Sequence, residues 1–314
     1  MLAERILAGD IRAASRLMRD IDDEIPSARE ELKLLYPHTG RAYLIGVTGP
    51  PGAGKSTLVD QLIAHYRKRG KRVGVVAIDP TSPFTGGAIL GDRIRMNRHA
   101  DDPGVFIRSL ATRGHLGGIS GSTVDIVNVL DAMGSDVIII ETVGVGQDEV
   151  DIVRESHTTI VVMVPGLGDD IQAIKAGILE IGDLFVVNKA DREGAERTAR
   201  ELEVMLELSP PHDDGWTPSV LRTQASRDIG IGELVDACDR HCSHLRTTGG
   251  FDRFRERRSK SQFDDLLQRT LFETARTILA RDGWYDRILT GVRDRAVDPY
   301  TAADQALSRV IQPH

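Results

Sequence analysis

Short apolar runs rich in Val and Ile alternate with helix-like segments between residues 42 and about 245. Each run is continuously apolar rather than alternating, which is typical of strands that are covered on both faces. This pattern predicts an α/β fold with a mainly parallel sheet, helices on both sides, and ligands at the carboxyl edge of the strands. The predicted strands are Tyr43–Val47, Val73–Ile78, Val105–Ile107, Val137–Ile140, Ile160–Val164, Leu184–Val187 and Val220–Leu221.

Both ends of the chain show helical spacing instead. Residues 1–41 carry apolar positions three and four apart, which predicts an N-terminal helical arm that packs on the central domain or on a partner. An apolar stripe from Phe263 to Leu279 predicts a long helix that ends by Gly283, and Asp298 and Pro299 are typical of the start of a last helix. We therefore expect three parts: the arm at 1–41, a central domain at 42–246, and a helical extension at 247–314.

The composition excludes few classes of protein, but it favours a cytoplasmic one. The 314 residues carry a net charge of −7 and only 4% aromatic residues, so we expect neither nucleic acid nor membrane as a partner. The N-terminus lacks the basic and apolar segments of a secretory signal, and no apolar stretch is long enough to span a bilayer. The two cysteines are too few for a disulfide scaffold.

A glycine-rich turn follows the first predicted strand and leads into a helix. Its spacing fits G-x-x-x-x-G-K-[ST], the phosphate-binding loop of P-loop NTPases, whose backbone N–H groups surround a triphosphate. In this pattern the lysine reaches the β- and γ-phosphates and the following hydroxyl binds Mg²⁺. The predicted nucleotide-binding residues here are Gly49, Pro50, Pro51, Gly52, Ala53, Gly54, Lys55, Ser56 and Thr57.

Carboxylates at the ends of two further predicted strands could complete a magnesium site. Asp79 and Asp92 lie in a turn-rich segment after the second strand, where they either bind Mg²⁺ or simply cap helices and form turns. Glu141 ends a buried strand, and Gly144 follows three residues later, as in the second nucleotide motif of this fold. Because the more familiar residue is Asp, Glu141 leaves direct or water-mediated coordination open. The Gly144 N–H would sense the γ-phosphate.

The sequence Asn188-Lys189-Ala190-Asp191 at another strand end predicts guanine recognition. The Asp191 carboxylate can accept from guanine N1–H and the 2-amino group, which adenine lacks, so we expect GTP and GDP rather than ATP. Gln224 and Ala225, after the last strand, would supply a loop that contacts the base through the N–H of Ala225.

Other polar residues admit more than one interpretation. Arg108 and Arg113 could stabilise transition-state charge, although a structural ion pair is the expected role of each. Gln147 could position the attacking water. Cys238 and Cys242 lie on one helical face near two histidines, which could indicate a metal site, but one helix cannot easily bring all four side chains to one ion.

The motifs together resemble the MeaB/ArgK family of GTPases. The resemblance rests on the stretches 46–57, 79–96, 108–118, 141–147, 165–177, 188–191 and 298–303, and Gln224 is a small departure because the family often has Ser there. It implies a GTP-dependent chaperone of an adenosylcobalamin-dependent acyl-CoA mutase, typically methylmalonyl-CoA mutase, which gates cofactor loading and protects or reactivates the mutase. It also implies a homodimer formed through the C-terminal extension, and roles for Asp169 and Lys175 in nucleotide coupling.

These observations predict a Mg²⁺-dependent GTPase in which water attacks the γ-phosphate. The expected catalytic residues are Lys55, Asp92, Glu141 and Lys175, and the expected metal-binding residues are Ser56, Asp79, Asp92 and Glu141. Two alternatives stay open: a GTPase metallochaperone, and a kinase or ATPase of an amino-acid transport system, an older label of the same family. The first should carry a His-rich tract or a Cys-x-x-Cys motif, which the sequence lacks, and the second requires ATP.

Overall fold

The computed structural model describes residues 1–79, 97–111, 121–142, 152, 155–166, 182–208, 214–281 and 283–311. The chain forms two compact units, Met1–Arg255 and Glu256–His314. The N-terminal helices and the sheet belong to one unit. The division into three parts that the sequence suggests stays a prediction.

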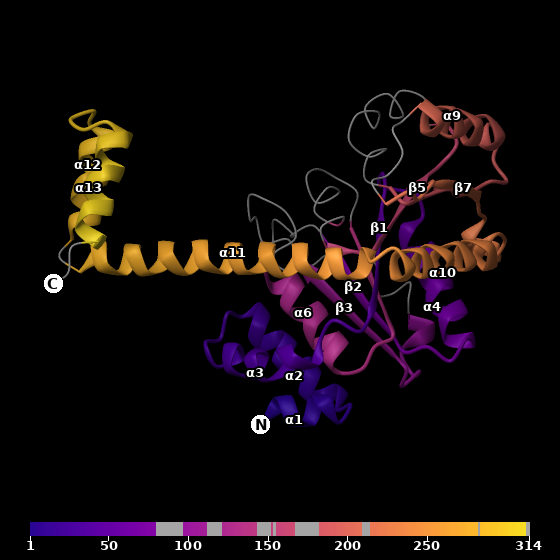
Figure 1. Ribbon diagram of the computed structural model, residues 1–314, viewed down its shortest axis with the longest axis horizontal. Coiled ribbons are helices and arrows are strands. Elements are labelled where there is room, and N and C mark those ends of the chain that lie inside the picture. Colours follow the sequence, from indigo (N-terminus) through magenta and orange to yellow (C-terminus); the bar gives the residue numbers. More distant parts are fainter. Residues whose placement is uncertain are drawn as a thin grey trace. The chain divides into compact units, whose positions relative to one another are not determined.

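Seven described strands form one parallel sheet in the order β3-β2-β4-β1-β5-β6-β7 (Figure 1). All seven strands predicted from the apolar runs are present, and the predicted α/β fold is confirmed. Because the neighbours of β1 come from later in the chain on both sides, the sheet has its topological switch point at the carboxyl end of β1, where ligands bind in such folds. The strands are β1 (Tyr43–Thr48), β2 (Val73–Asp79), β3 (Val105–Ala111), β4 (Val137–Glu141), β5 (Thr158–Met163), β6 (Leu184–Val187) and β7 (Ser219–Arg222).

Helices α4 (Lys55–Lys68) and α10 (Ile231–Thr247) cover one face of the sheet, with the 3-10 turn η3 (Ala225–Arg227) beside them. Their apolar side chains share a core with alternate residues of β1, β2, β4, β5 and β6. Tyr43 and Tyr66 are both buried in this core, and burial raises the pKa of each phenol above its usual range. The first helix after the phosphate loop is therefore fixed along most of its length.

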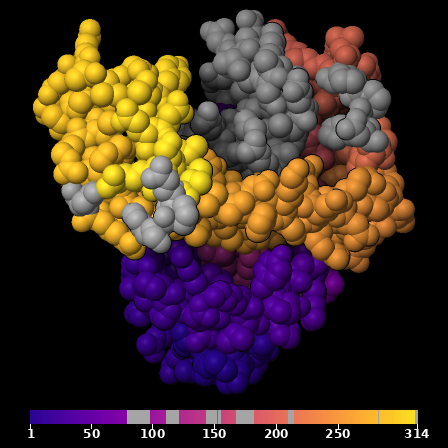
Figure 2. Space-filling model, turned by 60° about the vertical axis from the view of Figure 1, so that its left-hand side comes forward, coloured from indigo at the N-terminus to yellow at the C-terminus, as the bar shows by residue number. Residues whose placement is uncertain are grey.

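The opposite face is covered by α6 (Gly121–Ala132), α9 (Ala195–Leu208) and the N-terminal helices α1 (Leu2–Leu7), α2 (Ile11–Asp22) and α3 (Ser27–Leu35). Asp10 begins α2 by accepting hydrogen bonds from the N–H groups of Arg12 and Ala13. A short 3-10 turn η1 (Tyr36–His38) follows, and the buried carboxylate of Asp131 then accepts the N–H of Ala42 at the entrance to β1. The predicted arm thus packs on the sheet domain. Its indigo residues lie at the bottom of the view in Figure 2.

The second unit consists of helices. Helix α11 (Gly250–Ala280) starts before the unit boundary and is followed by α12 (Trp284–Arg293) and α13 (Pro299–Ile311). Leu279 and Ala302 are buried, and the Arg309 guanidinium lies over the ring of Trp284. Asp298 accepts hydrogen bonds from two N–H groups in the first turn of α13, which confirms the predicted helix start. None of the helices that the structure describes combines the length and apolarity needed to cross a membrane.

Candidate functional site

The turn from β1 into α4 depends on glycine at two close contacts. Gly49 has φ +136° and Gly54 has φ +91°, both in the left-handed region. A Cβ at Gly49 would lie 2.1 Å from the carbonyl oxygen of Val162, and one at Gly54 would lie 2.5 Å from Nδ2 of Asn188. The loop therefore runs tightly between β5 and Asn188 and ends at the first turn of α4, where N–H groups without helical partners attract anions.

Lys55 is the first residue of α4 and is buried, with 7% of its surface exposed. Its Nζ donates to the carbonyl oxygens of Gly49 at 2.7 Å and Pro50 at 3.1 Å. The side chain therefore folds back over the phosphate loop. A phosphate oxygen placed there would give the buried ammonium a charged acceptor in place of neutral carbonyls, which is a stronger interaction.

Ser56 and Glu141 meet at the carboxyl edge of the sheet. The Ser56 hydroxyl donates to Oε1 of Glu141 at 2.7 Å, and both residues are buried. Beside them, the hydroxyl of Thr142 donates to the hydroxyl of Thr48 at 3.1 Å. Oxygen donors of this kind are the ligands that Mg²⁺ prefers. Asp79 ends β2, two residues beyond the partner of Glu141 in the β2–β4 register, and only its backbone is described.

Asn188 connects the phosphate loop to the loop after β7. Its Nδ2 donates to the carbonyl oxygen of Ala53 at 2.8 Å, and its Oδ1 accepts from the Thr223 hydroxyl and the Ala225 N–H, both at 3.1 Å. The residue is 2% exposed, so these bonds lie in a dry environment. The N–H of Ala225, expected from the sequence to contact the base, thus has a side-chain acceptor in this structure.

Lys189 and Asp191 lie at the outer side of the same loop. Lys189 adopts a left-handed backbone with φ +55°, and its Nζ donates to the carbonyl oxygen of Gly52 at 2.7 Å. The N–H of Ala190 donates to the Thr223 carbonyl, which fixes the turn, and Asp191 is exposed. An exposed carboxylate at this position can accept hydrogen bonds from an incoming base. Gln224 pairs with Ile229 across the loop.

The structure therefore brings together the predicted residues of the phosphate loop, Glu141, and the loops at Asn188 and Ala225, whose roles remain predictions. Pro51 and Thr57 lie in this same segment, at the exposed outer turn and in the first turn of α4. The expectations for Asp92, Arg113, Gly144, Gln147, Asp169 and Lys175 fall outside the described residues.

The structure also bears on the two interpretations offered for Arg108 and on those offered for the Cys and His residues of α10. Arg108 pairs with Asp22 of α2, so it makes the structural ion pair that was expected.

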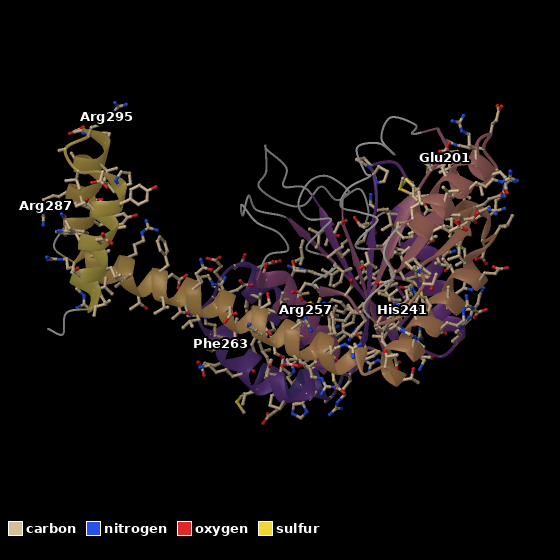
Figure 3. The ribbon with its side chains drawn as sticks, turned by 45° about the horizontal axis from the view of Figure 1, so that its top comes forward. Glu201, His241, Arg257, Phe263, Arg287 and Arg295 are labelled. Carbon is tan, nitrogen blue, oxygen red and sulfur yellow. The ribbon has the colours of Figure 1, made fainter. Side chains whose placement is uncertain are left out.

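His241 is 1% exposed and its Nδ1 lies 2.8 Å from the Thr158 hydroxyl, inside the first unit (Figure 3). Burial raises the pKa of the Cys238 thiol, which keeps it protonated. Among the described residues, no group of three His, Cys, Asp or Glu side chains could hold a metal ion.

Two further residues of α4 make polar contacts that no sequence motif indicated. Asp60 binds Arg98 and His99, and His65 Nε2 lies 2.7 Å from Asp228 in the loop that carries Ala225. The one signal in the sequence was the carboxylate of Asp60 four residues after Ser56, on the same helical face and next to the apolar Val59. Sequence spacing alone could not show which segment it faces.

A family model described as methylmalonyl-CoA mutase-associated GTPase MeaB matches residues 15–279. The chain belongs to this family. As a member of the MeaB family with this sheet topology, it is a P-loop GTPase. The resemblance seen in the sequence motifs is thereby confirmed.

Relatives and a solved structure extend the match over almost the whole chain. A Pyrococcus abyssi protein, provisionally named a GTPase, is 50% identical over 312 residues, which cover 99% of this chain and 96% of that protein. The Escherichia coli GTPase ArgK is 36% identical over 90% of this chain and 86% of its own length. A crystal structure of an LAO/AO transport system kinase superposes with a TM-score of 0.71 and 26% identity, and the match covers 99% of this chain and 97% of that one.

Proposed function

We propose that this MeaB-family GTPase binds Mg²⁺ and GTP at the β1–α4 turn and hydrolyses GTP to GDP and phosphate. In the cytoplasm, its nucleotide state would assist an adenosylcobalamin-dependent acyl-CoA mutase, methylmalonyl-CoA mutase or a close relative. The assistance consists of gating adenosylcobalamin loading and protecting or reactivating the mutase.

The observation that carries the nucleotide assignment is the hydrogen bonding of Asn188. One buried amide joins the phosphate loop at Ala53 to the base loop at Thr223 and Ala225. A nucleotide bound between these loops would place its phosphates at the first loop and its base at the second. With Asp191 available to accept from N1–H and the 2-amino group, the base that suits the site is guanine.

The residues at the strand edge fit a magnesium ion. Ser56 and Glu141 place a hydroxyl and a carboxylate 2.7 Å apart at the foot of the phosphate loop, and the chain could add Asp79 and Asp92. Bound there, Mg²⁺ would neutralise charge on the phosphates. Lys55 would hold the β- and γ-phosphate oxygens, and the N–H groups at the start of α4 would stabilise negative charge that develops on them.

Family membership supports the mutase as client. The family carries the mutase in its name, and a mouse relative, 32% identical over 87% of this chain and 66% of its own length, is named methylmalonic aciduria type A homolog, mitochondrial. The LAO/AO transport system kinase label belongs to the solved relative. A kinase of that type would need ATP, whereas the loops at Asn188 and Asp191 favour guanine.

A homodimer would bury the apolar stripe of the second unit. Phe263 of α11, labelled in Figure 3, is 63% exposed. Leu271 is 61% exposed, and Leu266 and Leu267 are exposed as well. Contiguous exposed apolar side chains of this kind mark interaction surfaces. A second copy of the same helix offers a self-complementary partner.

Calorimetry with purified adenosylcobalamin-dependent mutases tests this function. We expect binding of methylmalonyl-CoA mutase to differ at least about tenfold in affinity between the complexes with a non-hydrolysable GTP analogue and with GDP, because a nucleotide-driven chaperone requires such a difference. The Lys55→Ala variant should lose GTP hydrolysis and this difference together. Equal mutase affinity in both nucleotide states would contradict the chaperone role, and hydrolysis of ATP as efficiently as GTP would contradict the guanine assignment.

A further inference from the structure

The base loop (residues 224–229) is fastened to α4 at its outer end. Nε2 of His65, in the second half of α4, lies 2.7 Å from Oδ1 of Asp228. A carboxylate can only accept a hydrogen bond, so Nε2 is the donor. Nζ of Lys68 lies 3.9 Å from the other carboxylate oxygen. The contact thus joins the helix after the phosphate loop to a loop that follows 163 residues later.

The inner end of the base loop is held by Asn188, whose Oδ1 accepts from the Ala225 N–H at 3.1 Å. The N–H of Gln224 donates to the carbonyl oxygen of Ile229 at 2.9 Å, which closes the loop on itself. Inside the loop, the N–H of Asp228 donates to the carbonyl oxygen of Ala225 at 3.4 Å, and Asp228 has a left-handed backbone with φ +58°. A displacement of Asp228 would therefore reach Ala225 through this closed turn.

His65 lies on a helix that is fixed in the core. Its neighbours Ile63 and Tyr66 are buried between α4 and the sheet. The imidazole also lies against the first turn of α10, because a Cβ added at Gly232 would lie 3.9 Å from its Cε1. The same helix begins at Lys55 in the phosphate loop, roughly 15 Å away along the axis. His65 therefore links the position of the base loop to the helix that carries phosphate-binding residues.

The base loop offers a kind of contact that Asp191 cannot make. The Asp191 carboxylate only accepts, and it suits N1–H and the 2-amino group. A backbone N–H only donates, and guanine carries an oxygen acceptor at position 6 where adenine carries an amino group. The Ala225 N–H suits this oxygen, and it can serve a second acceptor beside Asn188 in a three-centre hydrogen bond. The strength of such a bond depends on distance and angle, and therefore on the position of the loop.

We propose that His65 is a positioning residue for base recognition. By holding Asp228, it fixes the base loop so that the Ala225 N–H meets the 6-oxo oxygen of guanine, and it thereby raises the preference for GTP over nucleotides that lack this oxygen. The inference rests on the proposed GTP function. It adds to that function a residue of α4 that lies outside both the phosphate loop and the base loop.

Two nucleotide analogues separate the contacts of the base. The 6-thio analogue of GTP keeps N1–H and the 2-amino group but carries sulfur, a weak acceptor, in place of the 6-oxo oxygen. Inosine triphosphate keeps the oxygen and lacks the 2-amino group. Competition with a fluorescent GTP analogue in the presence of Mg²⁺ gives the dissociation constant of each nucleotide. Urea unfolding without nucleotide reports the stability of each variant.

The variants remove the contact from either side. His65→Ala removes the donor, and Asp228→Gly removes the acceptor with a residue that adopts the positive φ freely. We expect the parent to bind GTP about fivefold more tightly than the thio analogue, which is the value of one hydrogen bond. Both variants should lower this preference below about twofold and leave the preference for GTP over inosine triphosphate unchanged. His65→Gln, whose amide can still donate to Asp228, should keep most of the thio preference.

Arg69→Ala is the matched control on the same helix. Arg69 lies one turn after His65, and its guanidinium binds Asp236, at 2.5 Å, and Asp239, which both belong to α10. This contact fastens α4 to α10 and not to the base loop. Its loss should lower the unfolding midpoint and leave both nucleotide preferences unchanged.

A thio preference that survives in His65→Ala would overturn the inference, and Asp228→Gly decides the question if His65→Ala does not fold. An equal loss of preference in Arg69→Ala would also overturn it, because the contact of His65 would then only stabilise the fold. A parent that binds ATP as tightly as GTP would overturn the proposed guanine assignment. A parent that prefers GTP to ATP but binds the thio analogue equally well would overturn the role of His65 alone.

Discussion

Nδ2 of Asn188 donates to the carbonyl oxygen of Ala53 at 2.8 Å, across 135 residues of sequence. The same side chain accepts from Thr223 and Ala225 with its other end. The phosphate loop and the loop that carries Ala225 are therefore joined by one buried amide.

Replacing Asn188 by Ala should weaken GTP binding strongly. The change leaves the donors and acceptors of both loops without their buried partner, which costs about 2–3 kcal/mol and corresponds to roughly 30- to 150-fold in affinity. Titration with a fluorescent GTP analogue measures the effect. Thr223→Val removes only one of the bonds and should cost less than about tenfold. If the two variants lose equal affinity, Asn188 does not couple the loops.

Gly49→Ala should destabilise the protein even without nucleotide. The added Cβ would lie 2.1 Å from a backbone oxygen of β5, which cannot move without disturbing the sheet, so we expect a loss of about 3 kcal/mol or more in the free energy of unfolding. Gly52→Ala is the matched control, because Gly52 also has positive φ but meets no atom within 4 Å. It should cost only about 1 kcal/mol. Urea unfolding of the nucleotide-free proteins measures both, and similar losses would show that the contact with β5 is unimportant.

Asp191→Asn should change the nucleotide preference from GTP toward xanthosine triphosphate. Xanthine carries a carbonyl where guanine carries the 2-amino group, so an amide can donate where the carboxylate accepted, and the ratio of kcat/KM values should move by a factor on the order of 10⁴. Competition between the two nucleotides measures this ratio. Glu193→Gln, an exposed carboxylate in the same turn, should leave the preference unchanged. An unaltered preference in Asp191→Asn would remove Asp191 from the base site.

Leu271→Glu should dissociate the proposed homodimer. A charge at the centre of the exposed stripe of α11 would be desolvated on association, so we expect the dimer dissociation constant to rise at least about tenfold. Sedimentation at micromolar concentration measures it. Arg197→Gln, at a side chain of α9 that is 84% exposed, changes the net charge by the same amount away from α11 and should leave association unchanged. A monomeric parent protein would contradict the dimer directly.

We expect Cys238 to make the free energy of unfolding fall as the pH rises above about 8. Burial raises the pKa of its thiol, so the folded state keeps the proton while the unfolded chain releases it above its usual pKa of about 8.5. Stability is therefore constant below about pH 8 and declines above it by up to about 1.4 kcal/mol per pH unit. Tyr43 and Tyr66, whose pKa values are also raised, add their own decline only above about pH 10.

Urea unfolding between pH 7.5 and 9.5 checks this prediction. The Cys238→Ala protein should be less stable at neutral pH and should show a flatter decline than the parent. Cys242→Ala should keep most of the slope, because Cys242 is only partly buried. A parent whose unfolding free energy does not change over this range would contradict the prediction.

The local pattern of the sequence was sufficient to predict the strands and the position of the phosphate loop. Continuous apolar runs identified all seven strands, since strands covered on both faces have no polar alternation. The glycine spacing located the phosphate loop because its backbone conformation permits few other residues. The ends of the strands were predicted less exactly. Strand β3 continues to Ala111, well beyond the apolar run, because its later residues are held by pairing with β2.

Contacts between distant segments could not be predicted in the same way. The sequence placed Arg108 in an ion pair but could not choose Asp22, and it could not show that Asp60 faces Arg98. Such contacts depend on which helix face meets which segment once the sheet has formed. His241 illustrates the point, because the sequence could not show that its Nδ1 lies beside the Thr158 hydroxyl.

The sequence by itself determined the family, the order of strands and helices along the chain, and the position of the phosphate loop, because these are encoded in short-range spacing and in the backbone freedom of glycine. The tertiary structure alone decided that β1 lies between β4 and β5, that Asn188 joins two loops, and that Asp60 is buried one turn from Ser56. The physical reason is that burial and hydrogen-bond partners are properties of the packed core, to which residues far apart in the chain contribute together.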